Sequence, residues 1–341
     1  MSGKISYRKV LSQNQNKTNV VVGIFLILYL IIGLLIDTFI HHKVIAKHYY
    51  QHDLLEAILS FQIIPYATFA MLVIGVVSVL VTFSMHDKMM MWGSEYQEID
   101  ENSAIMLEEK SLYNVIAELK IAANLNYMPK VYLIHADYMN AFASGYSEKS
   151  AMVAITTGLM EKLNRGELQA VMAHEISHIK HMDIKLTLFV GVLSNIMLLV
   201  LDLMMDIFRF TGGGSNKDNN NNSGNLKVVV MVALLVLRIV FPMISIALTM
   251  FLSRTREYMA DAGAVKLTRD KESLASALIK IHQDYSQNEY EDSGIEVRKA
   301  AYIYNPVHSF LGDLMSTHPD LESRITALGM SNLLRSEKTG K

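Results

Sequence analysis

The chain has 341 residues, enough for one large domain or two ordinary ones, and 51% of them are apolar. Its mean hydropathy of +0.24 is high for a water-soluble protein and indicates membrane-embedded segments. The net charge of −2 excludes a broad basic face, so no nucleic-acid partner is expected. Cysteine is absent, which excludes disulfides and thiolate metal sites and leaves His, Asp and Glu to hold any zinc.

Four apolar runs are long enough to cross a bilayer, which takes about 20 helical residues. Four such runs are not expected from the buried helices of a soluble core, and the first is too long to be the apolar part of a signal peptide. We therefore predict a mainly α integral membrane protein with two transmembrane hairpins, 19–83 and 186–252. Their four spans are residues 19–40, 61–83, 186–205 and 228–252.

Lys and Arg residues predict how the spans are oriented. They are more frequent in the tail 1–18 and in 253–271 than in the loops 41–60 and 206–227. Because positive charge favours the cytoplasmic side, both termini are predicted to be cytoplasmic. The stretch 211–224 is rich in Gly and Asn, which is typical of a flexible loop, here on the outer side.

Two stretches outside the spans, 84–185 and 253–341, then lie on the cytoplasmic side and together can build one α+β domain with a small sheet. Helical spacing of apolar residues favours helices at 111–125 and 164–181. Apolar, β-branched runs favour strands at 130–136 and 151–160.

The motif HEISH lies in the second of these helices. His174 and His178 are four residues apart, so on a helix both imidazoles project from one face, one turn apart. That spacing suits two corners of a tetrahedral zinc site, and Glu175 can reach a water there without binding the metal. His181 lies on the same face. Because a catalytic zinc keeps one position open, we expect His181 at the surface and not as a ligand.

The topology indicates where a third ligand is found. Without a proline, the HEISH helix is expected to continue into the third span, which begins about eight residues after His178, or about 12 Å along the axis. The fourth span returns to the same side, and "SRTREYMADAG" (253–263) follows it directly. Glu257 is then at a height similar to that of His178 and is the predicted third ligand. Asp261, one turn further on, is predicted to accept a hydrogen bond from a ligand imidazole.

These residues also resemble a known family. HEISH followed by "MD", and "SRTREYMADAGA" after a transmembrane hairpin, are similar to the HtpX-type membrane zinc metallopeptidases, relatives of the CAAX prenyl-protein endopeptidases. The segments "NAFASG" (140–145) and "NPVHSF…STHPDLESRI" (305–325) match as well. The resemblance runs from about residue 20 to 330. It implies a zincin-like domain and a zinc metalloendopeptidase of the gluzincin kind, with one Zn²⁺ per chain.

The resemblance also assigns roles to single residues. It implies that His174, His178 and Glu257 bind the zinc and that Glu175 is the general base. Asp183 occupies the position of the family's usual Asp after the zinc helix. Three further residues are implied near the site, as a substrate-groove residue, an oxyanion-stabilising residue and a substrate-binding residue: Asn140, His318 and Arg324.

The resemblance further implies a biological setting. It places the protein in the bacterial inner membrane with a cytoplasmic active site, in protein quality control and stress response. The expected partners are the lipid bilayer and polypeptide substrates, either membrane proteins that are misfolded or damaged or other unfolded chains. Assembly of several copies of the chain is compatible with the sequence.

Three other functions are left open at this point. A CAAX-type prenyl-protein peptidase is disfavoured because those relatives usually carry more spans. A membrane scaffold with a structural zinc would need no general base beside its ligand, so Glu175 argues against it. A transporter would need polar residues along several spans.

Asp202 and Arg238 lie well inside the third and fourth spans. From the cytoplasmic side their depths are about 24 Å and about 21 Å. A charge in a span is costly unless it meets a partner or water. We therefore predict an Asp202–Arg238 ion pair that holds the hairpin in register. The alternative is that each side chain reaches the outer headgroups separately.

Overall fold

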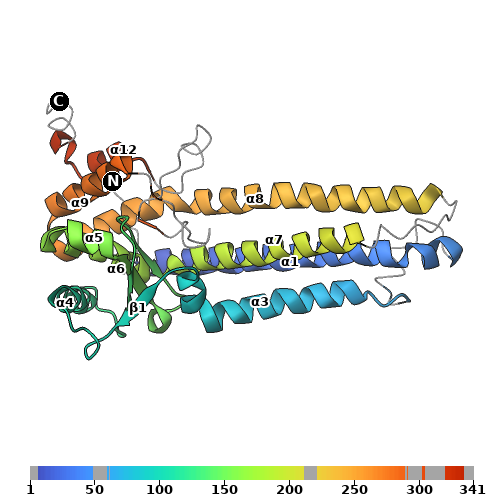
Figure 1. Cartoon of the computed structure of the whole chain (residues 1–341), viewed down its shortest axis with the longest axis horizontal. Helices are drawn as coiled ribbons and strands as arrows, with labels where there is room; N and C mark the ends of the chain where they lie inside the picture. The colour runs from blue at the N-terminus through green and yellow to red at the C-terminus, as the bar shows by residue number, and fades with distance from the viewer. Residues whose placement is uncertain are drawn as a thin grey trace. The chain divides into compact units, whose positions relative to one another are not determined.

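The computed structural model describes residues 7–48, 60, 62–210, 221–288, 290, 302–303 and 319–333. Long helices and one small sheet make up the fold (Figure 1). The chain divides into two compact units. Unit 1 comprises Met1–Thr18, Met85–Gly191 and Ile246–Lys341, and unit 2 comprises Asn19–Ser84 and Val192–Ser245.

Unit 2 is built from parts of four helices: α1 (Tyr7–His48), α3 (Tyr66–Met91), α7 (Ile184–Phe210) and α8 (Asn221–Thr268). Three of them contain segments long and apolar enough to cross a membrane, namely Asn16–Thr38, Tyr66–Met91 and Ile184–Ile207. The predicted fourth span lies within α8. Among the described side chains of α8, the apolar segment is Met231–Ile244, which is shorter than a bilayer crossing. These segments confirm the predicted membrane-spanning character, whereas the predicted number of four spans is approximate.

The second span begins later than predicted, at Tyr66 instead of residue 61. Pro65 precedes the helix and has no N–H to donate to an earlier turn. Asp37 of α1 caps the new helix start, because its carboxylate accepts from the N–H groups of Ala67 (3.0 Å) and Thr68 (2.7 Å). This fully buried carboxylate joins α1 to α3.

Charged and aromatic contacts join the other helices of unit 2. Arg238 Nε of α8 donates to the Asp202 carboxylate of α7, so the predicted ion pair is confirmed. Both side chains are half-exposed. Phe25 of α1 meets Phe241 of α8 edge to face, with ring centroids 5.5 Å apart.

Unit 1 contains a mixed four-stranded sheet of order β1-β2-β4-β3. Its strands are β1 (Tyr96–Ile99), β2 (Lys130–Ile134), β3 (Ala141–Ser144) and β4 (Met152–Thr156). β2 and β4 are parallel, with Val131 opposite Val153, and the two outer strands pair antiparallel to them. β3, which comes from the "NAFASG" segment, is therefore a sheet edge.

Two predicted strands are present but shorter than expected. β2 ends at Ile134, and the run 151–160 changes from strand to helix after Thr156. Residues 157–160 belong to α5 (Thr157–Lys162), because the Thr156 side chain accepts from Leu159 N and caps that helix. A short apolar run is compatible with both structures, so its pattern could not place this boundary.

Helices cover the sheet and form the core of unit 1. α6 (Arg165–His181) packs on β3 and β4, and α4 (Leu107–Ala122) and α9 (Lys271–Gln287) pack on α6. α12 (Leu321–Ala327) adjoins α9. The predicted helices 111–125 and 164–181 correspond to α4 and α6. Because α6 lies between the sheet and two helices, its side chains are held from several directions.

Candidate metal centre

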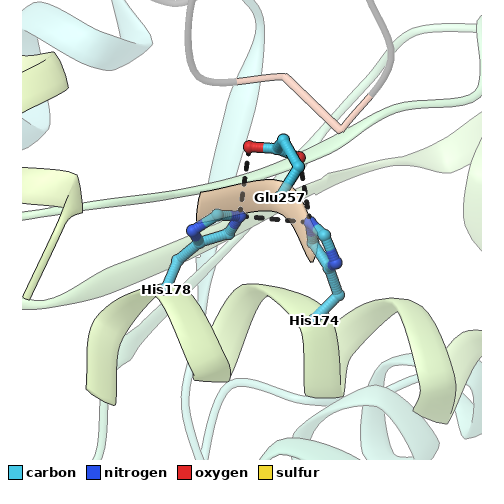
Figure 2. A group of neighbouring side chains, drawn as sticks. All are labelled: His174, His178 and Glu257. Atoms are coloured by element: carbon cyan, nitrogen blue, oxygen red, sulfur yellow. Dashed lines mark hydrogen bonds and ion pairs between the residues drawn. The ribbon is translucent and has the colours of Figure 1, made fainter. Parts of the chain in front are cut away.

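α6 carries HEISH and is fixed firmly at its start. Asn164 caps it by accepting from Glu167 N, while the Glu167 carboxylate accepts from Asn164 N at 2.9 Å. The helix therefore begins in a defined register. His174 and His178 follow one turn apart, and both point toward Glu257 of α8 (Figure 2).

The three predicted ligand side chains meet in unit 1. One ligand atom from each of His174, His178 and Glu257 lies within 4.8 Å of the others. The two Nε2 atoms are 3.1 Å apart, and they lie 3.5 and 3.7 Å from the two Glu257 oxygens. Side-chain exposure is 1% for His174, 13% for His178 and 4% for Glu257. Apart from the partly accessible His178, this is a buried cluster.

This donor set fits zinc. Ligand distances of about 2.0–2.2 Å in a tetrahedron place neighbouring ligand atoms about 3.3 Å apart. The two Nε2 atoms, 3.1 Å apart, are close to that value, and each lies within 3.7 Å of a different Glu257 oxygen, so the cluster is of the size that a zinc ion needs. Two imidazole nitrogens and one carboxylate oxygen are also ligands that zinc commonly takes, and three protein ligands leave a fourth position for reaction.

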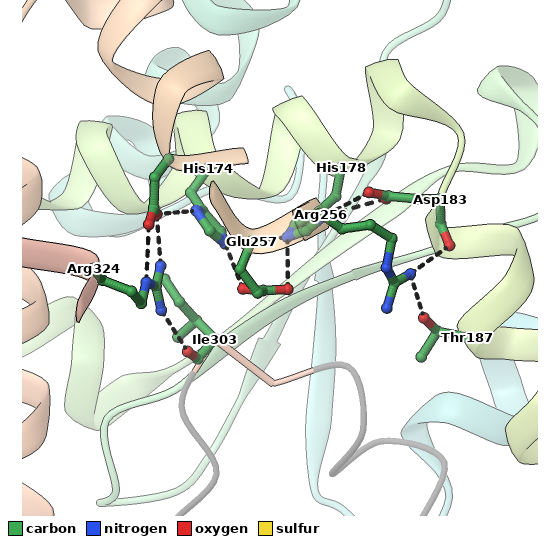
Figure 3. A network of polar contacts seen from close by, with 9 residues as sticks. His174, His178, Asp183, Thr187, Arg256, Glu257, Ile303 and Arg324 are labelled. Carbon is green, nitrogen blue, oxygen red and sulfur yellow. Dashed lines mark hydrogen bonds and ion pairs between the residues drawn. The ribbon is translucent and has the colours of Figure 1, made fainter. Parts of the chain in front are cut away.

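Each histidine has a carboxylate beside its Nδ1 atom, and Figure 3 shows the one beside His178, which is Asp183. His174 Nδ1 is 2.9 Å from Asp261 Oδ1, as the sequence predicted for Asp261. His178 Nδ1 is 3.1 and 3.2 Å from the two oxygens of Asp183. With a proton on each Nδ1 beside these carboxylates, each Nε2 is the ring nitrogen that faces the cluster and binds a metal once it is deprotonated.

Buried charges reinforce this orientation. Burial raises the pKa of Asp261, but the Arg324 charge and the His174 hydrogen bond outweigh it and lower the pKa to about 2. Burial lowers the pKa of His174, but Asp261 and Glu257 outweigh it and raise the pKa to about 9. Asp261 is thus an ionised acceptor at neutral pH. A metal must displace a proton from His174 Nε2, so metal binding releases protons.

The expected continuous helix from HEISH into the third span is wrong. α6 ends at His181, Met182 is left-handed (φ 54°, ψ 30°), and α7 begins at Ile184. The chain turns at this elbow, residues 182–183. The turn brings the Asp183 carboxylate back to the imidazole five residues earlier. Continuing the α-helix would have carried Asp183 to another face.

Glu175 lines the same small cavity as the three candidate ligands. It is 1% exposed. The cavity has a volume of about 30 Å³, and Ala143 of β3, Tyr302 and Ile303 form part of its wall. This volume exceeds the roughly 10–15 Å³ that one water molecule needs on the same water-sized-sphere measure, so the cavity has room for a water molecule or an ion.

Comparisons with known proteins agree with this geometry. The profile of Peptidase family M48 matches residues 106–331. The chain belongs to peptidase family M48. A relative named Protease HtpX homolog, from Helicobacter acinonychis (strain Sheeba), is 40% identical over 328 residues, covering 95% of this chain and 98% of the relative.

Two further comparisons are more distant. A Protease HtpX homolog from Dictyoglomus thermophilum is 36% identical over 219 residues, covering 64% of this chain and 68% of the relative. The crystal structure of S. mikatae Ste24p covers 94% of this chain and 66% of its own chain, at 18% identity and a TM-score of 0.44. That structural likeness is too low to support an inference.

The resemblance stated from the sequence is confirmed, and this M48 member is a metallopeptidase with apolar helices long enough to cross a membrane. The family implies a metal, generally zinc. Among the described residues, the group that could hold one is His174, His178 and Glu257. His181 is half-buried and is not part of this group.

The other site residues implied by the resemblance lie in different surroundings. Arg324 is 3% exposed and donates to both Asp261 oxygens, at 2.7 and 3.0 Å. Asn140 is fully buried, and its Nδ2 donates to Tyr285 Oη at 3.0 Å. A substrate-contacting role for either stays a prediction. His318 lies outside the described residues.

Sequence reasoning missed several neighbours of this M48 centre. The sequence gives Asp183 a family position but no contact, because its contact with His178 depends on the left-handed Met182. Arg256 was not singled out, although it precedes Glu257 and lines the cavity. Tyr302 and Ile303 reach the cavity from a distant part of the chain, and no sequence signal marks them.

Proposed function

We propose that the protein is a membrane-embedded, zinc-dependent endopeptidase. His174, His178 and Glu257 would hold one zinc ion, and Glu175 would act as the general base. The observation that carries this proposal is the group of three ligand side chains, with one ligand atom of each within 4.8 Å of the others, beside a buried glutamate that lines the same cavity. A structural zinc site would need no such glutamate.

The residues of the site suit peptide hydrolysis. When bound, zinc would polarise the carbonyl of the peptide bond to be cleaved and lower the pKa of a bound water molecule to about 7. The Glu175 carboxylate accepts a proton from the attacking water as its oxygen bonds to the carbonyl carbon. It then delivers that proton to the leaving nitrogen as the C–N bond breaks. Asp261 and Asp183 keep the two imidazoles oriented throughout.

The edge strand β3 is the proposed platform for the substrate backbone. An extended peptide can add to a sheet edge through main-chain hydrogen bonds, and this recognition tolerates many sequences. Ala143 of this strand lines the cavity, while Ile303 N already donates to Ala141 O at 2.9 Å. A substrate that paired with Ala141 would therefore replace the hydrogen bond from Ile303.

We further propose that the active site faces the cytoplasm of a bacterial cell from its inner membrane. The Lys and Arg distribution supports this orientation. The proposed substrates are membrane proteins, above all misfolded or damaged ones, because a site joined to membrane helices meets polypeptides of the membrane first. The Protease HtpX homolog relatives support a protease function but name no substrate.

Metal analysis of the detergent-purified full chain tests the proposed site. We expect one zinc per chain and casein cleavage that stops with chelator and returns with Zn²⁺. Glu257→Ala should lose both metal and cleavage, because one of three protein ligands is gone. Stoichiometric zinc of unchanged affinity in Glu257→Ala would move the third ligand elsewhere. Casein cleavage insensitive to chelator would exclude a metallopeptidase mechanism.

The absence of cysteine allows a direct test of orientation. Single variants Ser215→Cys, in the predicted outer loop, and Ser286→Cys, exposed on α9, would be treated in intact cells with a membrane-impermeant maleimide. We expect labelling at 215 and none at 286 until the cells are lysed. The reverse pattern would place the active site outside the cytoplasm.

A further inference from the structure

The two histidines of the proposed metal site are supported unequally. The carboxylate behind His174 is that of Asp261 on α8, and it accepts from both Nε and Nη2 of Arg324. The carboxylate behind His178 belongs to Asp183, which lies on the elbow between α6 and α7. An elbow is less constrained than a helix interior, so a further group is needed to fix Asp183.

The elbow also has an unfavourable backbone. Met182 is left-handed at φ 54°, a conformation that is sterically unfavourable for a non-glycine residue. Such a residue persists when its surroundings over-determine it. Asp183, the next residue, is 2% exposed. The elbow is thus a left-handed helix end followed directly by a buried carboxylate.

Arg256 supplies such a contact. Its Nη1 donates to the main-chain oxygen of Asp183 at 3.1 Å and to Thr187 Oγ1, one turn into α7, also at 3.1 Å (Figure 3). Arg256 directly precedes Glu257 on α8 and lines the same cavity. The Arg256 guanidinium thus connects the elbow beside His178 to α8, the helix that carries Glu257.

We propose that Arg256 is a positioning residue for the metal site. It holds the Asp183 carboxylate behind His178, and it holds Glu257 opposite that histidine, so it sets how closely the ligand atoms are preorganised for the metal. Arg256 acts through these residues and takes no proton in hydrolysis. This inference rests on the proposed zinc site. It identifies Arg256 as the residue that couples α6 and α8, the two helices that carry the zinc ligands.

The primary measurement is Zn²⁺ affinity of the full chain in detergent, by competition with a chromophoric chelator. Arg256→Met should weaken Zn²⁺ binding by about 10- to 100-fold, as expected for loss of a group that orients ligands. Arg256→Lys, which keeps the charge and a donor, should recover part of that loss. Arg165→Met is the matched control, because Arg165 makes only a surface ion pair with Glu118 among the contacts described for it. The Zn²⁺ affinity of Arg165→Met should equal that of the wild type.

A double-mutant cycle tests the route of action. Asp183→Asn removes the carboxylate behind His178 but leaves the main-chain oxygen that Arg256 contacts. If Arg256 acts through Asp183, the double variant should lose less affinity than the product of the two single losses. The electronic spectrum of Co²⁺ bound in place of Zn²⁺ should change in Arg256→Met and in Asp183→Asn, and stay unchanged in Arg165→Met.

Several outcomes would overturn the inference. The inference is wrong if Arg256→Met keeps both the Zn²⁺ affinity and the Co²⁺ spectrum of the wild type. It is also wrong if the loss of Zn²⁺ affinity in the double variant equals the product of the two single losses. Should Arg256→Met not fold, Arg256→Gln carries the same expectation and the same contrary result. If the wild-type chain itself bound no Zn²⁺, the proposed metal site would fail. Tight wild-type binding with no effect of Arg256 would reject this inference alone.

Discussion

Glu175 and His174 are neighbours on α6, yet the proposed roles of their side chains differ. His174 is a candidate ligand, whereas Glu175 lines the cavity without belonging to the ligand group. Glu175→Gln should therefore keep stoichiometric zinc and lower casein cleavage by at least about 10²-fold, because general-base catalysis contributes about 10²–10⁴-fold. Zinc content and turnover would be measured on the same preparation. Near-normal cleavage would remove Glu175 from the mechanism.

At the scale of elements, the approach of α8 to α6 determines whether Glu257 reaches the histidines. A Cβ added at Gly263 would collide with Ser177 Oγ and lie 2.8 Å from Ser177 Cβ. Gly263→Ala should push the helices apart and weaken Zn²⁺ binding, since overpacking costs about 1–3 kcal/mol. The exchange Ser177→Gly with Gly263→Ala should restore part of the affinity. No loss in Gly263→Ala would show that this contact does not control the site.

The ion pair between α7 and α8 permits a second prediction at this scale. Asp202→Arg and Arg238→Asp should each lower the apparent melting temperature in detergent, because each leaves two like charges facing each other. The charge swap that combines them should recover part of the loss. Additive losses would mean that the two residues do not depend on each other in fixing the register of these helices.

At the scale of the whole molecule, acid should destabilise the protein partly through Glu167, which joins α6 to α9. Its carboxylate is 3% exposed and accepts from Lys280 Nζ (2.8 Å) and Ser276 Oγ (2.6 Å). Burial raises the pKa of Glu167, but these contacts and Asn164 N outweigh it and lower the pKa below its usual 4.5. The stabilisation is therefore complete above the unfolded-state pKa and is lost as pH falls through the folded-state pKa.

Glu167→Gln should lower stability at pH 7 by about 2 kcal/mol, the size expected for hydrogen bonds to a charged group. The gap from the wild type should narrow as pH falls below 4.5, the usual pKa of the side chain. Thermal unfolding with chelator present separates this effect from metal loss. Glu118→Gln, at a surface ion pair, is the control and should show no such narrowing. If the stability difference between the wild type and Glu167→Gln did not change with pH, Glu167 would not be a source of the destabilisation by acid.

The sequence alone determined the parts of this protein that depend on local pattern. Apolar runs predicted the membrane helices, HEISH predicted two candidate ligands one helical turn apart, and the return of the chain through α8 predicted Glu257 and Asp261. The Asp202–Arg238 pair followed from depth in the spans. Each of these needs only helix geometry, because a regular helix fixes the height and direction of every side chain.

Tertiary structure decided what local pattern leaves open. The left-handed Met182 breaks the helix expected after HEISH, and only this break brings Asp183 to His178. Arg324 reaches the Asp261 carboxylate, and Arg256 reaches the main-chain oxygen of Asp183, across long separations in the chain. Ile303 N likewise donates to Ala141 O of β3 although the two residues are far apart in the chain. No local signal marks such contacts, because they arise when helix and sheet packing brings remote side chains together around one buried charge cluster.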